Sequence, residues 1–118
     1  PGAAVHVVEG VSLADGQPLA AFRSVFPAAR FPGLLAELGQ RQSITGALAA
    51  CGLADYTRAS TRLTAKAAPA MLALTLQIAE GAPILRSVAI NVDGEGCPIE
   101  YGTTWFAGDR VTLTVSPE

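Results

Sequence analysis

The sequence predicts an α+β domain, in which helices lie beside an antiparallel β-sheet. Three observations lead to this fold class. Apolar and β-branched runs are separated by Asp-Gly or Gly-rich turns, which is typical of antiparallel hairpins. Apolar residues with helical spacing occur between these runs. Strands joined by tight turns or by helical excursions build an antiparallel sheet with helices packed against it.

The N-terminal part of the chain is predicted to be a β-hairpin. Residues 5–13 have a strand pattern, and residues 19–25 return as the partner strand. The turn between them contains Asp15-Gly16, a pair that tolerates positive φ.

Two short helices are expected next. Residues 31–38 place their apolar side chains on one helical face, and Gly39 is the expected stop. Ser43 is the expected N-cap of a second helix over residues 44–51, which ends at Gly52.

The second half of the chain is predicted to contain a long strand, a helix and a three-stranded meander. The strand covers residues 55–65 and the helix residues 66–80, with Pro69 in its first turn. The meander strands are expected at the following three ranges: 84–92, 99–106 and 111–115.

Length and composition restrict the class of protein. The chain has 118 residues, enough for one domain with one core. Half of the residues are hydrophobic, 15% are charged, and the net charge is −2. The sequence has no basic patch or basic helix, which argues against nucleic-acid binding by this segment. No apolar run is long enough for a transmembrane helix. Two cysteines and one histidine do not suggest a structural zinc site, and two reduced thiols are expected.

Two predicted strand faces carry candidate ligand-binding residues. Arg58, Ser60 and Arg62 share one face of the long strand, and arginine is well suited to phosphates and carboxylates. The two arginines stand about 13 Å apart at ~3.3 Å per residue, so one small anion is not expected to engage both. An ordinary solvated face with surface arginines is the alternative.

The middle strand of the meander offers the second face. Glu100, Thr104 and Phe106 lie on it with the gap of Gly102, while Trp105 lies on the opposite face. Such a face is a plausible floor for a small polar ligand, and a half-solvated sheet face is the alternative.

Three segments carry a family resemblance: LADGQPLA (13–20), YTRASTRLTAKAA (56–68) and GAPILRSVAINVDGEGCPIEYGTTWFAGDRVTL (81–113). They resemble the UTRA domain, which is the effector-binding domain of GntR-type bacterial transcription regulators of the HutC subfamily and shares the chorismate lyase fold. Within that group the amino-acid sequence of these segments is most similar to that of regulators of phosphonate metabolism.

The resemblance implies one effector-binding domain over residues 1–118, preceded in the whole protein by a winged helix-turn-helix. It implies a cytoplasmic homodimer that binds a small anionic metabolite and contacts DNA only through the missing N-terminal domain. No cofactor, metal or membrane partner is implied.

The resemblance also assigns residue roles. Arg62 matches an arginine that contacts the effector's phosphate or carboxylate, whereas Ser60 stands where a second arginine is common. Glu100 holds the family's acidic position, and Phe106 replaces a frequent tyrosine. Arg110 and its neighbour Asp109 are expected to form a structural ion pair or turn cap.

These inferences combine into one hypothesis for the ligand site. Arg62 pairs with the ligand anion, Ser60 and Thr104 donate hydroxyl hydrogen bonds, and Glu100 accepts hydrogen bonds from a hydroxyl or amine. Arg58 extends the positive wall, and Phe106 lies on the same strand face as Glu100.

Two other functions remain open at this point. A chorismate lyase-like enzyme is one, because this fold supports catalysis, although the sequence has no nucleophile elbow, metal cluster or His-carboxylate pair. A dimerisation module with a vestigial pocket is the other.

Overall fold

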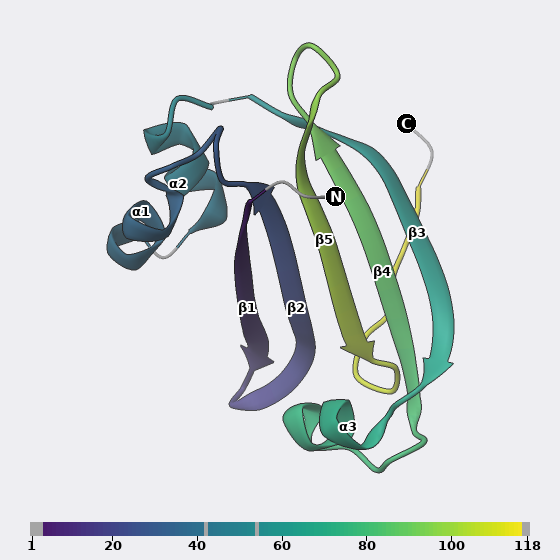
Figure 1. Ribbon diagram of the computed structural model, residues 1–118. Coiled ribbons are helices and arrows are strands. Elements are labelled where there is room, and N and C mark those ends of the chain that lie inside the picture. The colour runs from purple at the N-terminus through teal and green to yellow at the C-terminus, as the bar shows by residue number, and fades with distance from the viewer. Residues whose placement is uncertain (1–3, 42, 54, 117–118) are drawn as a thin grey trace. The chain divides into compact units, whose positions relative to one another are not determined.

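The computed structural model describes residues 4–41, 43–53 and 55–116. Its elements follow in the order β1 (Val5–Ala14), β2 (Gln17–Pro27), α1 (Leu34–Arg41), α2 (Ile44–Ala50), β3 (Thr57–Ala67), α3 (Ala70–Leu76), β4 (Pro83–Val92) and β5 (Pro98–Ala107). The five strands form one antiparallel sheet, which confirms the predicted α+β class (Figure 1). Within the described residues, no helix has the length and hydrophobicity needed to span a bilayer.

The strand order is β1-β2-β5-β4-β3, so β1 and β3 are the edge strands. Two of the neighbouring pairs, β1-β2 and β4-β5, are hairpins. The first turns at Asp15 and Gly16, whose φ angles of 51° and 76° suit a two-residue hairpin turn. Strand β4 lies between β5 and β3, and every residue of β3 is exposed.

The described chain divides into two compact units. The first unit comprises residues 4–8, 24–61 and 89–102, and the second comprises residues 9–23, 62–88 and 103–116. Each unit has a hydrophobic core of its own.

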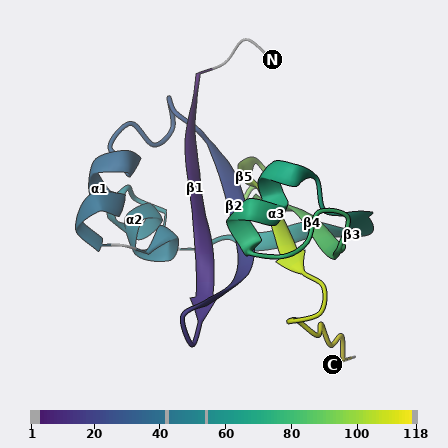
Figure 2. The ribbon, with the colours of Figure 1, turned by 90° about the horizontal axis from the view of Figure 1, so that it is seen from below.

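The core of the first unit lies between the sheet and the helix pair α1 and α2, which lie side by side (Figure 1 and Figure 2). Its most buried side chains are Phe26, Phe31, Leu34, Leu48 and Ile99. Ser43 is the N-cap of α2 as predicted, because its Oγ accepts a hydrogen bond from the Gly46 amide at 3.2 Å.

Polar contacts fix two further segments of the first unit. His6 of β1 donates from Nε2 to the Phe31 carbonyl oxygen at 2.8 Å, so its ring has a hydrogen-bond partner. Asp93 holds the β4–β5 turn: its Oδ1 accepts from the amides of Glu95 and Cys97, and its carboxylate pairs with Arg30. The Cys97 amide first and the Arg30 guanidinium second hold the pKa of Asp93 below its ordinary value.

The core of the second unit forms where α3 packs on the sheet. Its buried side chains are Ala21, Ala68, Ala73, Leu76 and Ile84, with Trp105 partly buried against them.

Arg110 closes the end of α3. Its Nη1 donates to the carbonyl oxygens of Pro18 and Leu76, both at 2.8 Å, and its Nη2 donates to that of Gln77 at 3.0 Å. Arg110 therefore has a structural role, but not the predicted one: its side chain binds carbonyl oxygens of β2 and of the end of α3, and not its own turn.

One predicted strand is absent. Residues 111–115 form no strand, although their alternating apolar residues suggested the third strand of a meander. A third meander strand would have to pair with β5. Both edges of β5 are already occupied, by β2 and β4, so no place is left for it.

The helix boundaries also differ from the prediction. Helix α1 begins and ends three residues later than expected and includes Gly39, which is not its stop. Strand β3 continues to Ala67, so α3 is much shorter than the expected 66–80. Pro69 is the residue before its first turn, and Gln77, with a φ of 56°, ends it.

Candidate functional site

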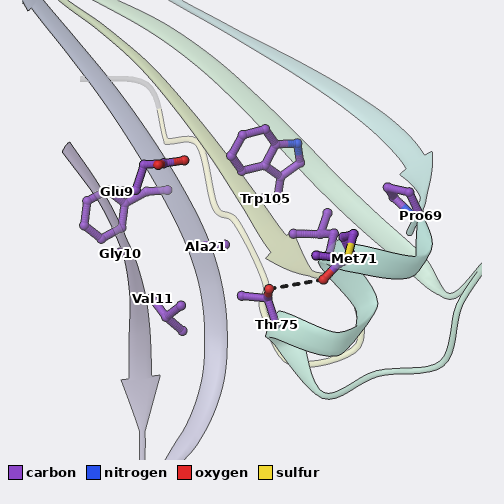
Figure 3. A pocket seen from close by; sticks show the side chains of 10 residues that line it. Glu9, Gly10, Val11, Ala21, Pro69, Met71, Thr75 and Trp105 are labelled. Carbon is purple, nitrogen blue, oxygen red and sulfur yellow. Dashed lines mark hydrogen bonds between the residues drawn. The ribbon is translucent and has the colours of Figure 1, made fainter. Parts of the chain in front are cut away.

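A groove in the second unit has a volume of about 590 Å³ (Figure 3). This volume lies within the range of small-molecule pockets. Strands β1, β2 and β5 and helix α3 supply its walls. The lining residues are Glu9, Gly10, Val11, Ala21, Phe22, Pro69, Met71, Leu72, Thr75 and Trp105.

The local sequence explains how the groove forms. Pro69 has the extended backbone that precedes α3, and the short helix that follows presents Met71 and Thr75 to the hollow. Trp105 packs against the core of the second unit and also lines the groove. Met71 is 77% exposed, so this wall contacts solvent and has no cover within the described chain.

Gly10 and Phe22 form a matched pair in one wall. A Cβ atom at Gly10 would lie 2.7 Å from Cζ of Phe22 and 2.8 Å from its Cε2, well inside van der Waals contact. The absence of a side chain at Gly10 therefore allows the ring of Phe22 to lie against the backbone of β1. Any larger residue at this position would displace the ring.

None of the six sequence-predicted site residues lines the groove. Arg58, Ser60 and Glu100 belong to the first unit. Arg62, Thr104 and Phe106 belong to the second. Both arginines and Ser60 are exposed on β3, whereas Glu100, Thr104 and Phe106 are partly buried on β5.

The first unit joins two of these residues through a third that the sequence analysis missed. Arg58 donates from Nε to Oδ1 of Asn91 at 2.7 Å, and Asn91 donates from Nδ2 to Oε1 of Glu100 at 2.9 Å. Arg58 also donates from Nη1 to Thr61 Oγ1 at 3.0 Å. Asn91 is only 8% exposed, so this hydrogen-bonded chain from β3 through β4 to β5 is anchored at a buried amide.

A narrow space at Gly102 lies beside this chain. A Cβ atom there would stand 3.6 Å from Ser24 Oγ and 3.7 Å from Glu100 Oε2. Ser24 is 5% exposed. The gap of Gly102 that the sequence predicted next to Glu100 therefore exists, with a buried hydroxyl at its side.

No three His, Cys, Asp or Glu side chains of residues 4–41, 43–53 and 55–116 come close enough together to hold a metal ion. Cys51 is partly buried and Cys97 is exposed, and both are free thiols.

Known proteins are similar to this chain over nearly all of its length. Residues 1–112 match the UTRA domain family. An uncharacterized HTH-type transcriptional regulator of Rhizobium meliloti (strain 1021) is 41% identical over 115 residues, which are 98% of this chain. The chain spans 47% of that relative's length.

Solved structures agree with this match. PhnF from Mycobacterium smegmatis has a TM-score of 0.90 at 25% identity, covering 99% of this chain and 52% of that one. The ligand-binding domain of a putative GntR-family regulator from Bordetella bronchiseptica has a TM-score of 0.89 at 22% identity, covering 99% and 74%. The second likeness concerns the fold alone. The chain belongs to the UTRA domain family.

Proposed function

We propose that this chain is the effector-binding domain of a transcription regulator and that the effector occupies the groove of the second unit. The observation that carries the proposal is the groove itself: a hollow of about 590 Å³ with aromatic and aliphatic walls and a few polar groups. Pockets of this size and character are the usual seats of small ligands. Membership of the UTRA family supports a sensing role.

The single tryptophan of the chain provides the assay. Trp105 lines the groove, so its fluorescence reports occupation of this site. The purified chain should be screened by thermal shift against metabolite classes, because a ligand that binds only the folded state raises the melting temperature. Each hit is then titrated against the Trp105 signal.

Gly10→Ala is the matched site variant, because its methyl group would displace the ring of Phe22, which lines the groove. Gly39→Ala is the control, because a Cβ there meets nothing within 4 Å. We expect hits to change the Trp105 signal and to lose affinity in Gly10→Ala only. Hits that stabilise the chain without either effect would place the effector elsewhere and refute this seat.

A second candidate ligand site is the polar side of β3, where the sequence analysis expects an anionic metabolite such as a phosphonate. The favouring observation is the chain from Arg58 through Asn91 to Glu100, which holds a guanidinium and a carboxylate in fixed positions. In this proposal Arg62 pairs with the anion and Arg58 extends the positive surface. Ser60 donates a hydrogen bond and Glu100 accepts one in the first unit, and the hydrogen bond of Thr104 and the contact of Phe106 are separate proposals for the second unit.

Calorimetry with phosphate and methylphosphonate tests this second seat. Arg62→Ala should weaken binding, since hydrogen bonds to charged groups contribute roughly 1.5–3 kcal/mol. Arg41→Ala removes an exposed arginine of α1 that pairs with Glu37 and serves as the control. Equal affinities in both variants would remove Arg62 from the site.

The remaining features of the proposal follow from family membership. The whole protein is proposed to be a cytoplasmic homodimer of the HutC subfamily that binds DNA through an N-terminal winged helix-turn-helix. An effector then acts only if it binds one arrangement of the dimer better than the other. Light scattering of the purified chain tests the dimer.

We propose that the chain binds an effector without catalysing a reaction. The alternative function is a chorismate lyase-like enzyme activity. Incubation of chorismate with the chain decides between them: release of pyruvate would establish the enzyme.

A further inference from the structure

We infer that the groove of the second unit selects an organic ammonium ion, that is, a protonated amine on an apolar or aromatic body. This inference rests on the proposed function, in which the same groove holds the effector. It adds the chemical class of the ligand, which follows from three properties of the lining residues.

The first property is charge. Glu9 is the only lining residue with a formal charge, and its carboxylate is directed toward the hollow (Figure 3). Its nearest cation, Nε of Arg23, stands 4.0 Å from Oε2, and Arg23 does not line the groove. At this distance and exposure an ion pair is weak, so the carboxylate keeps its capacity to bind a second cation.

The second property is the balance of hydrogen-bonding groups. Thr75 uses its own proton in a hydrogen bond to the Met71 carbonyl oxygen at 3.1 Å (Figure 3). Its oxygen can then act toward a ligand only as an acceptor. Glu9 is an acceptor as well, and among the lining side chains only the indole N–H of Trp105 is a donor. A ligand group that donates hydrogen bonds fits these partners, whereas a phosphate or carboxylate does not.

The third property is the aromatic surface. Trp105 and Phe22 both line the hollow, and aromatic faces attract ammonium groups through the ring quadrupole. The close fit of the Phe22 ring against Gly10 fixes one of these faces in position. Leu72 and Met71 supply aliphatic and thioether contacts for the body of the ligand.

An anionic ligand would meet the opposite conditions. It would approach the carboxylate of Glu9, find no lysine or arginine in the lining, and lose its hydration without a charged partner. The groove is therefore expected to discriminate by charge among ligands of the same shape.

Three probes of nearly equal size test this discrimination: phenethylamine, phenethyl alcohol and hydrocinnamate, which are cationic, neutral and anionic at neutral pH. Each is titrated into the chain with Trp105 fluorescence and calorimetry as readouts. We expect phenethylamine to bind roughly threefold to fivefold more tightly than the alcohol and hydrocinnamate to bind most weakly, because a contact with an exposed charge contributes up to about 1 kcal/mol.

Glu9→Gln should remove most of the preference, weakening the amine roughly threefold to fivefold while leaving the alcohol unchanged. Glu9 is an exposed side chain, so this variant should fold normally. Glu80→Gln removes the same charge from another exposed position of the second unit outside the groove and should change nothing.

The possible outcomes separate this inference from the proposal on which it rests. If hydrocinnamate binds as tightly as the amine and changes the Trp105 signal, the groove remains the effector seat and the ammonium class is wrong. An amine preference that survives Glu9→Gln also overturns the inference. If no probe changes the Trp105 signal at millimolar concentration, the ammonium class is refuted, and the Gly10→Ala screen then decides whether the groove is a ligand seat at all.

Discussion

Replacement of Arg110 by alanine should destabilise the second unit strongly, because one side chain satisfies three carbonyl groups from two other segments. The distances to Pro18, Leu76 and Gln77 are 2.8, 2.8 and 3.0 Å. Hydrogen bonds from a charged donor contribute roughly 1.5–3 kcal/mol each, but three bonds from one partly exposed group are not additive. We therefore expect a total loss of about 2–4 kcal/mol in the free energy of unfolding.

This loss corresponds to a large change in melting temperature. An unfolding entropy of about 2.1 cal/mol/K per residue over a chain of this length gives roughly 0.25 kcal/mol/K, so the melting temperature should fall by about 8–16 °C. Calorimetry or circular dichroism measures the shift. Arg110→Lys keeps the charge near the end of α3, but one ammonium cannot reproduce the geometry of two guanidinium nitrogens, so its loss should be intermediate.

Arg41→Ala provides the comparison. Arg41 makes an exposed pair with Glu37 one helical turn away, which is expected to contribute only about 0.3–0.5 kcal/mol. If Arg110→Ala lowered the melting temperature by no more than Arg41→Ala, the capping role assigned to Arg110 would be refuted.

Three further predictions concern the first unit. The stability that Asp93 contributes is complete above its unfolded pKa near 3.8 and is lost as the pH falls through its lower folded pKa. Unfolding curves of the native chain should therefore approach those of Asp93→Asn only below about pH 4. A difference in stability that stays constant with pH would contradict the pairing of Asp93 with Arg30. Asn91→Ala leaves partners in β3 and β5 unpaired and should cost about 1–3 kcal/mol by urea denaturation, whereas a neutral result would show that the bridge is dispensable. Ser43→Ala should cost about 0.5–2 kcal/mol through the lost bond from the Gly46 amide, and hydrogen exchange in α2 should increase, while an unchanged α2 would argue against the cap.

Local chemistry was predictable from the sequence. The Asp15-Gly16 turn and the Ser43 cap depend on residues within a few positions of each other, and both appear in the structure as expected. Strand pairing depends on distant segments, and there the prediction was wrong. Residues 111–115 have a strand pattern, but the pattern does not reveal that β2 already occupies the edge of β5 that a meander would require.

The candidate sites also depend on strand pairing, which the sequence did not reveal. Sequence reasoning examined the strands that became β3 and β5, but β4 lies between them, so any direct connection had to include a residue of β4. Asn91 is that residue, and its signal was present in the sequence as an amide among the apolar residues of 88–92. The groove could not be predicted, because the sequence analysis expected one long helix and not the short α3, whose exposed turn lines the groove together with Trp105.

Strand β3 is an edge strand at risk of aggregation, and its cationic residues are expected to reduce that risk. An uncovered strand at the border of a sheet is a template on which other chains can aggregate, and lysine or arginine side chains are a common protection. Arg58, Arg62 and Lys66 recur at every fourth position of this strand. They repel a second copy approaching in the same way, so neutral replacements at these positions are expected to reduce solubility. Any loss of anion binding in such variants must therefore be measured on protein that remains dispersed.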